Sequence, residues 1–225
     1  MYLYNEENAR VKFQIDPENR IGIGMYGGVF KINENTCLKV YKNSDEIKLE
    51  VLKLIKQLNL PNYYKLIDFY YNKNHIFKAH TMEYYESKEI DILRMPIEYS
   101  IDNISKLLIA VNTLTQNNVL ISDMHTENII MNNNDIIIID ADLYTINRFY
   151  RQLTLQIKNL SALRELYKNI YLEALQKYHP EYFDFLGKEA IRQIFDPFNI
   201  NPEQAIVETL SKYEYPIDYV RKKVR

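Results

Sequence analysis

Residues 21–30 read IGIGMYGGVF and hold four of the five glycines in this 225-residue chain. The four are Gly22, Gly24, Gly27 and Gly28. An apolar run at 29–32 follows, then a polar cluster at 33–35 and the alternating run TCLKVY at 36–41. In a dinucleotide-binding fold such glycines open a helix, whereas here they lead into strand-like sequence. The stretch therefore predicts a glycine-rich strand–turn–strand.

The glycine-rich stretch is a candidate phosphate-binding element. Backbone amides that carry no side chains can approach anionic oxygens closely, and Tyr26 at the tip would shield such a site from water. An ordinary hairpin that uses its glycines for twist is the alternative interpretation. The sequence that follows has to decide between the two.

Composition and charge narrow the class of protein. Hydrophobic residues make up 47% of the chain and charged residues 26%, with a net charge of −2. This balance suits one broad domain or two small lobes, and it gives no general attraction to nucleic acid or to anionic lipid. Cys37 is the single cysteine, which favours a reducing compartment. Because no apolar run reaches the ~20 residues that cross a bilayer, and no signal-peptide pattern opens the sequence, we expect a cytoplasmic protein without nucleic-acid or membrane partners.

Hydrophobic periodicity indicates a first region over residues 1–85. A helix is predicted over 44–60, with Ser44 as its cap, and two further strands over 65–71 and 75–84. With the strands around the glycine-rich stretch, these elements form a small antiparallel sheet with one helix.

Residues 86–225 are predicted to form a mostly helical second region. Helices are expected over 100–117, where Ser100 would be the cap, over 148–171, and from Asn201 onward. The exception is the segment NIIMNNNDIIIID at 128–140, in which two isoleucine-rich runs flank a polar tip and predict a hairpin. The expected fold class is α+β.

Lys39 is the second candidate site residue. On a strand it shares one face with Cys37 and Tyr41, so it can project beneath the glycine-rich loop. A lysine that holds phosphates needs a carboxylate to orient it, and Glu46 and Glu50 lie four apart on the predicted helix. Glu50 is the preferred partner. A solvated lysine at a sheet edge is the alternative.

The segment ISDMHTENIIM at 121–131 is the third candidate. A hairpin centred on Asn134 would place Asn128 opposite Asp140, with Asp123 on the loop just ahead. Two acids and an amide would then converge, which provides hard oxygen ligands for Mg²⁺ and a further carboxylate to orient or deprotonate a hydroxyl. Turn formation by Asp123 and Asn128, with Asp140 ending a strand, is the alternative.

With these motifs in this order, residues 21–143 resemble the protein-kinase-like superfamily. Its glycine loop, strand lysine, HRDxxxxN and DFG motifs are matched by Gly22, Gly24, Gly27, Val29, Lys39, Asp123, Asn128 and Asp140. The segment Met82, Glu83, Tyr84 and Tyr85 resembles the family's gatekeeper and hinge, whose backbone binds adenine. The resemblance implies a bilobal fold, with an N-lobe over 1–85 and a helical C-lobe over 86–225 that carries the catalytic loop at 121–128 and the metal-binding DAD at 140–142.

Several positions depart from the family pattern. Ile121 and Ser122 replace the His and Arg of HRD, so the arginine that reads activation-loop phosphorylation is missing. Ala141 and Asp142 replace the Phe and Gly of DFG, and Asp142 is a possible extra metal ligand. His125 creates a D-x-H-x-x-x-N pattern that is similar to aminoglycoside and choline kinases, which phosphorylate small molecules. No APE motif follows, which puts peptide recognition in doubt.

The resemblance implies transfer of the γ-phosphoryl group of ATP to a hydroxyl, with ATP and Mg²⁺ as cofactors. The implied roles are acceptor positioning by Asp123 with His125 near the transferred phosphate, phosphate binding by Lys39 with Glu50, and metal binding by Asn128, Asp140 and Asp142. A Ser/Thr protein acceptor is favoured over a small molecule. A pseudokinase, a nucleotide-binding scaffold and a helical interaction protein stay open as alternatives, and no oligomeric state is implied.

Overall fold

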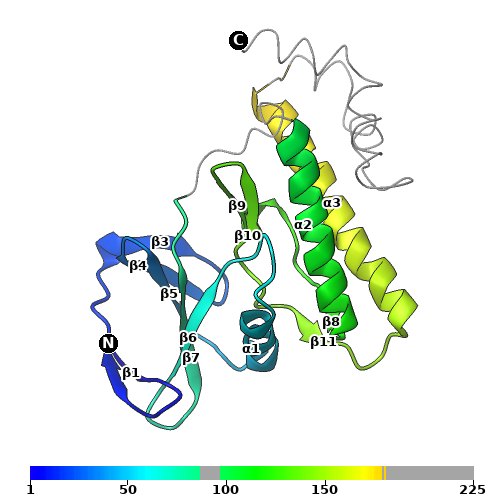
Figure 1. The fold of residues 1–225 in the computed structure, drawn as a ribbon. Coiled ribbons are helices and arrows are strands. Elements are labelled where there is room, and N and C mark those ends of the chain that lie inside the picture. The colour runs from blue at the N-terminus through cyan, green and yellow to red at the C-terminus, as the bar shows by residue number, and fades with distance from the viewer. Residues whose placement is uncertain (87–96, 179, 181–225) are drawn as a thin grey trace. The chain divides into compact units, whose positions relative to one another are not determined.

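The computed structural model describes residues 1–86, 97–178 and 180 (Figure 1). The chain divides into two compact units, Met1–Glu86 and Ser87–Arg225. The described part holds an antiparallel sheet of seven strands, two smaller strand pairs and three α-helices. This mixed α and β architecture agrees with the predicted α+β class.

The first unit is built on a seven-stranded sheet in the order β2-β1-β6-β7-β5-β4-β3, with every neighbouring pair antiparallel. Its strands are β1 (Tyr2–Tyr4), β2 (Arg10–Lys12), β3 (Arg20–Ile23), β4 (Gly27–Asn33), β5 (Thr36–Tyr41), β6 (Leu66–Tyr71) and β7 (Phe77–Glu83). A short 3₁₀ helix, η1 (Pro17–Asn19), precedes β3, and helix α1 (Leu49–Leu58) lies between β5 and β6 in the chain. The predicted strands at 65–71 and 75–84 are confirmed as β6 and β7.

The side chains of β5 alternate between two covered faces of the sheet. Leu38 and Val40 pack on one side, in a cluster that also contains Leu3, Phe13, Tyr70 and Ala79. Cys37, Lys39 and Tyr41 point to the other side and are also buried. Strand β5 is therefore enclosed on both faces, and its side chains are held in fixed positions.

Helix α1 begins at Leu49, five residues after the predicted start. The preceding residue, Lys48, has a non-helical backbone (φ −87°, ψ 82°), and Ser44 is buried in the segment before it. The prediction of Ser44 as the helix cap is therefore wrong. Glu46 lies outside the helix and does not share a helical face with Glu50. Val51 and Ile55, whose spacing of four contributed to the prediction of this helix, are buried, as is Leu52.

The described part of the second unit combines two long helices with short strand pairs. Its elements are α2 (Ile97–Gln116), β8 (Val119–Leu120), the 3₁₀ helix η2 (Thr126–Asn128), β9 (Ile129–Asn132), β10 (Asp135–Ile138), β11 (Thr145–Ile146) and α3 (Gln152–Tyr178). Strand β9 pairs with β10, and β8 with β11, both antiparallel. Helices α2 and α3 lie side by side (Figure 1). The hairpin predicted over 128–140 is confirmed.

Two helix starts differ from the prediction. Helix α2 begins three residues before Ser100, which therefore lies inside the helix and is not its cap. Helix α3 begins at Gln152, four residues later than predicted. The Oδ1 atom of Asn147 accepts the backbone N–H of Tyr150 at 2.8 Å, which closes a turn just before the helix. The helix predicted from Asn201 lies outside the described residues.

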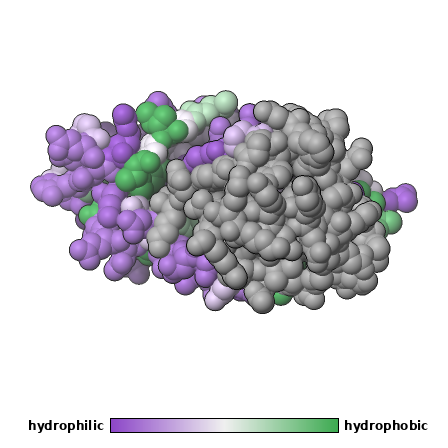
Figure 2. Space-filling model, turned by 90° about the horizontal axis from the view of Figure 1, so that it is seen from above, coloured by the Kyte–Doolittle hydropathy of each residue, from purple (hydrophilic) through white to green (hydrophobic). Residues whose placement is uncertain are grey.

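Apolar side chains interrupt an otherwise hydrophilic described surface on the face shown in Figure 2. The exposed large apolar residues of the chain include Ile21, Ile23, Met25, Phe149, Leu153 and Ile157.

Within the described ranges, no helix is both long enough and apolar enough to span a bilayer.

Candidate functional site

The glycine-rich stretch forms a tight turn between β3 and β4. Gly22 lies opposite Val29 in the register, and the Gly24 N–H donates to the Gly27 carbonyl at 2.9 Å. Tyr26 is half-buried and its carbonyl accepts the N–H of Lys42 at 2.8 Å, which ties the turn to the end of β5. The predicted strand–turn–strand is confirmed.

Two glycines of the turn differ in their surroundings. A Cβ atom on Gly27 would collide with the backbone carbonyl group of Val40, so the packing of β4 on β5 requires glycine there. A Cβ atom on Gly24 would meet no other atom within 4 Å. Packing within the protein therefore explains Gly27, whereas the backbone at Gly24 is bare and borders open space.

Lys39 is buried in the middle of the sheet, with 7% of its surface exposed. Its register partners are Val29 on β4 and His80 on β7. The Nζ atom lies 5.8 Å from the centre of the Tyr41 ring. Burial of an ammonium group is costly unless charged or polar groups compensate it. The alternative interpretation of Lys39 as a solvated edge residue is therefore wrong.

His80 is a buried polar residue that the sequence did not single out. It is fully buried, and its Nδ1 atom lies 3.2 Å from the hydroxyl of Tyr41. The rings of Tyr41, Tyr64 and Phe69 surround it at centroid distances of 5.7, 6.2 and 6.4 Å. The sequence could have indicated that His80 is buried, because it lies on a predicted strand with alternating apolar residues, at a position that faces the core.

The predicted partner of Lys39 lies in the first turn of α1. Glu50 is exposed there, and Glu46 accepts a hydrogen bond from the side chain of Asn43 at 3.3 Å. The structure places neither carboxylate in a buried position. The pairing of Lys39 with Glu50 stays a prediction.

The predicted hinge follows the end of β7. The backbone N–H of Glu83 donates to the Lys65 carbonyl at 2.9 Å, and that of Tyr84 donates to the Asn35 carbonyl at 2.8 Å. Met82 is buried. The hydroxyl of Tyr85 donates to Glu83 Oε2 at 2.9 Å, and burial, followed by that hydrogen bond, raises the pKa of Tyr85. Two of the hinge N–H groups are thus already used within the unit.

Cys37 lies against this segment from β5. Its Sγ atom is 3.7 Å from the Met82 carbonyl oxygen and 3.8 Å from that of Glu83. Burial raises the pKa of the thiol to about 11, so it is protonated at neutral pH. The thiol acts here as a small apolar group with a weak donor.

In the second unit, the catalytic-loop candidates form one hydrogen-bonded cluster. The Nδ2 atom of Asn128 donates to the Asp123 carbonyl at 2.8 Å and to Asp123 Oδ2 at 3.1 Å. His125 Nε2 lies 3.2 Å from Asp123 Oδ1 and 3.1 Å from Asn128 Nδ2. Asp123 has a φ of 64°, a conformation that non-glycine residues rarely adopt and that is concentrated at functional sites.

The hairpin brings Asp140 next to this cluster, with a register one residue away from the prediction. Ile139 lies opposite Asn128, since its N–H donates to the Asn128 carbonyl at 2.9 Å. The predicted pairing of Asn128 with Asp140 is therefore wrong by one residue. The turn has two residues at its tip, Asn133 and Asn134, of which Asn133 has a positive φ of 57°. The hairpin is thus centred between Asn133 and Asn134, not on Asn134.

Asp140 and Asp142 lie together at the end of this hairpin. The backbone N–H of Asp142 donates to Asp140 Oδ1 at 3.0 Å, which orients that carboxylate. Asp142 is only 4% exposed, and Asp140 is half-buried. Burial of carboxylates is stable only with hydrogen bonds or cations nearby.

The donor set suits a magnesium–nucleotide complex better than a protein-only metal site. No group of three or more His, Cys, Asp or Glu side chains that could hold a metal occurs in the described part of the chain. Mg²⁺ commonly takes one or two carboxylates and completes its shell with water and phosphate oxygens. The two carboxylates of Asp140 and Asp142, with the amide oxygen of Asn128, fit that pattern in chemistry. The hydrogen bonds described above for the Asn128 side chain are made by its Nδ2 end, so Oδ1 is the atom that would face a metal.

Two buried asparagines on the long helices anchor this region, and the sequence did not identify either. Asn159 on α3 accepts the N–H of Ile121 at 2.9 Å and donates to the Val119 carbonyl at 2.8 Å. Asn103 on α2 donates to the Asn134 carbonyl at the hairpin tip at 2.6 Å. In the sequence, each is a polar residue within a helical stripe of apolar residues, and this pattern could have marked it as buried. The hydrogen-bond partners of the two asparagines can be identified only from the folded structure.

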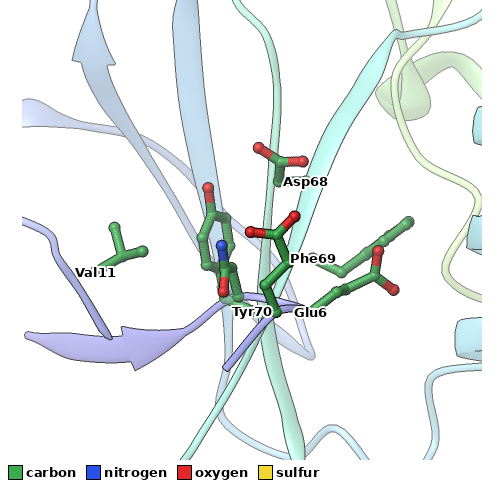
Figure 3. A pocket seen from close by; sticks show the side chains of 7 residues that line it. Glu6, Val11, Asp68, Phe69 and Tyr70 are labelled. Atoms are coloured by element: carbon green, nitrogen blue, oxygen red, sulfur yellow. The ribbon is translucent and has the colours of Figure 1, made fainter. Parts of the chain in front are cut away.

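A cavity of about 350 Å³ lies elsewhere in the first unit (Figure 3). It is lined by Asn5, Glu6, Glu7, Val11, Asp68, Phe69 and Tyr70. Lys53 lies 2.5 Å from Glu6 and lowers its pKa through a hydrogen bond, and Lys56 lies 3.6 Å from Asp68. None of the predicted site residues lines this cavity, and its acidic side chains are largely neutralised.

Comparison with known proteins gives a distant structural match. No protein-family model matches the chain, and no curated protein matches it. Among solved structures, the chain is similar to the kinase PK-1 of Cydia pomonella granulovirus, with a TM-score of 0.47 and 22% sequence identity. The match covers 62% of this chain and 58% of that one, so the chain spans little more than half the length of PK-1. A similarity of this size assigns no activity.

Proposed function

We propose that the chain is an ATP-dependent phosphotransferase that moves the γ-phosphoryl group of ATP to a hydroxyl, with a Ser/Thr residue of a protein as the acceptor. The observation that carries this proposal is the cluster of Asp123, His125 and Asn128, held by hydrogen bonds of 2.8–3.2 Å at a residue with a φ of 64°. The contacts of the Asp123 carboxylate with both His125 and Asn128 support this role, because a turn that only reversed the chain would not need an oriented carboxylate.

Asp123 would position and deprotonate the acceptor hydroxyl. Its two carboxylate oxygens have different partners within hydrogen-bonding distance. Asp123 Oδ1 lies near His125 and Asp123 Oδ2 near Asn128, so the group has a fixed orientation. The side chain is also exposed, which leaves it accessible to a hydroxyl. A positioned carboxylate of this kind can accept the proton of the attacking group.

Asp140, Asp142 and Asn128 would hold Mg²⁺. An ion bound there would neutralise part of the negative charge on the phosphoryl group during transfer. The hydrogen bond from the Asp142 N–H fixes the orientation of Asp140, and the bonds of Asn128 Nδ2 direct its oxygen away from Asp123. These residues are thereby preorganised as ligands before the nucleotide arrives.

The first unit would bind the nucleotide. Lys39 would neutralise the α- and β-phosphates, assisted by Glu50, and the bare backbone near Gly24 would lie over the phosphates. At the hinge, the N–H groups of Glu83 and Tyr84 already have acceptors, so the N–H of Tyr85 is our choice of donor to adenine.

A small-molecule acceptor is the second candidate, and one observation favours it. His125 lies 3.2 Å from Asp123 and 3.1 Å from Asn128, so an imidazole stands directly beside the proposed base. This arrangement gives a structural counterpart to the D-x-H-x-x-x-N pattern of aminoglycoside and choline kinases. The acceptor must therefore be decided by experiment.

The test is transfer of label from [γ-³²P]ATP with Mg²⁺, using a general protein substrate such as casein in one arm and a panel of aminoglycosides and choline in the other. We expect labelled protein, and loss of transfer in Asp123→Asn by a factor of about 100 or more. Glu127→Gln is the matched control, because it removes an exposed carboxylate from the same loop. Labelled small molecules alone would establish the second candidate. Stabilisation by Mg-ATP without any transfer would identify a nucleotide-binding scaffold and contradict the proposal.

A further inference from the structure

Helix α3 carries an exposed apolar stripe at its N-terminal end. Phe149, Leu153 and Ile157 are 92%, 69% and 57% exposed. Leu153 and Ile157 are four residues apart and share one face of the helix, and Phe149 lies in the turn just before it. The opposite side of the same helix is buried, as Leu155 and Asn159 show with no exposed surface. The stripe is therefore not part of the core of the second unit.

The aromatic end of the stripe is held in an ordered turn. The Oδ1 atom of Asn147 accepts the N–H of Phe149 at 3.1 Å and that of Tyr150 at 2.8 Å, and its Nδ2 atom donates to the Tyr150 carbonyl at 2.8 Å. Lys158 Nζ lies 4.8 Å above the ring of Tyr150. Because the backbone below Phe149 is fixed, binding through its ring would cost little additional ordering.

The segment of sequence that carries the stripe holds charges of one sign. Residues 143–164 contain Arg148, Arg151, Lys158 and Arg164 and no acidic residue, although the chain as a whole has a net charge of −2. Arg148 and Arg151 are exposed beside the stripe. Arginine presents planar donors that match carboxylates, and arginine and aromatic residues are enriched at protein interfaces.

We propose that this surface, the α3 docking face (Phe149, Leu153, Ile157, Arg148 and Arg151), binds a polypeptide in which bulky apolar side chains are flanked by Asp or Glu. Leu153 and Ile157 are about 6 Å apart along the helix axis, and Phe149 extends the surface beyond the N-terminal end of the helix, which fits the anchors of a single helix or strand. Charge complementarity selects an acidic partner. The proposal concerns only the second unit and does not depend on phosphotransfer.

The test starts with selection of random 12-residue peptides displayed on phage against the immobilised full chain. We expect enrichment of peptides that combine Phe, Leu or Ile with Asp or Glu. One enriched peptide is then measured by fluorescence anisotropy. Binding should weaken by about tenfold or more in Leu153→Ser/Ile157→Ser and in Arg148→Glu/Arg151→Glu, and the contribution of charge should fall in high salt.

Ile76→Ser is the matched control, because Ile76 is an exposed apolar residue on the first unit. It should bind the peptide as the wild type does, and circular dichroism should show all variants folded. Enrichment of basic or uncharged peptides would overturn the proposal, as would acidic peptides whose binding is the same in both double variants. Binding of the face to phosphatidylserine vesicles in place of peptides would overturn it as well.

Discussion

Lys39 on β5 and His80 on β7 are register partners, and both side chains are buried. An ammonium group beside an imidazole within a layer of aromatic rings is an expensive arrangement for folding alone. Proteins retain buried charges mainly where a ligand or a specific interaction uses them. The burial of Lys39 in this pair is the feature of the first unit on which its proposed role in phosphate binding depends.

Replacement of Lys39 separates function from folding. We expect Lys39→Met to leave the melting temperature unchanged or to raise it, because an apolar side chain of similar length replaces a buried charge. Phosphotransfer should fall by a factor of about 100 or more if the ammonium neutralises phosphates. Thermal unfolding and label transfer measure the two effects. A loss of activity that simply follows a large loss of stability would argue for a structural role.

The two acidic residues after the hairpin should differ in importance. We expect Asp140→Asn to abolish transfer and stabilisation by Mg-ATP, whereas Asp142→Asn should retain part of both, since Asp140 is the residue oriented by a backbone N–H. A ligand present at 100 times its Kd stabilises a protein by about 2.7 kcal/mol, which a thermal shift detects readily. If Asp142→Asn proved the more damaging change, the metal assignment would be wrong.

The hairpin turn should be sensitive to side-chain shape at Asn133. Since its φ of 57° disfavours a β-carbon, Asn133→Ala should lower the free energy of unfolding by about 1 kcal/mol, whereas Asn133→Gly should not. Urea unfolding of the three proteins measures this difference. Equal stabilities for the alanine and glycine variants would mean that the turn does not have the two-residue form.

Asn159 should contribute more to stability than its polar side chain suggests. Asn159→Leu leaves the Ile121 N–H and the Val119 carbonyl without their partner in a buried region. Each unsatisfied group costs about 1–3 kcal/mol, so a loss of several kcal/mol in urea unfolding is expected. Gln156→Leu, an exposed change on the same helix, is the control and should have little effect.

Cys37 should make stability depend on alkaline pH. The folded pKa of the thiol is about 11, above the unfolded value of about 8.5. Between these values the unfolded chain loses a proton that the folded chain keeps, so the stabilisation present below pH 8.5 declines as the pH rises toward 11. The difference in melting temperature between the wild type and Cys37→Ala should therefore shrink from pH 8 to pH 10.5. A constant difference over this range would contradict the assigned burial of the thiol.

Local patterns in the sequence predicted the glycine-rich turn, strands β4 to β7 and the β9–β10 hairpin. These elements have clear alternation and polar turn residues, so their signals are contained within a few residues. Strands β1 and β2 were not predicted, because three residues are too few for a period of two to be recognised. Their place at the edge of the sheet depends on pairing with distant residues.

The members of the cluster in the second unit could be predicted from the sequence, but not its detailed geometry. Asp123, His125 and Asn128 are close in sequence, and the structure brings them together. The helix start at Leu49 and the hairpin register were wrong, because a cap and a turn are decided by backbone angles at one or two residues such as Lys48 and Asn133. His80 and Asn159 were missed because burial of a polar side chain is a property of the packed fold.

The unequal surroundings of the glycines also have a practical use. Since a β-carbon at Gly24 meets nothing within 4 Å, a cysteine introduced there can carry a fluorophore without disturbing the sheet. The same label at Gly27 would break the contact with β5. A label at Gly24 therefore probes the proposed role of this turn by itself: if the bare backbone lies over the phosphates, the bulk of the fluorophore should weaken stabilisation by Mg-ATP while the sheet stays folded.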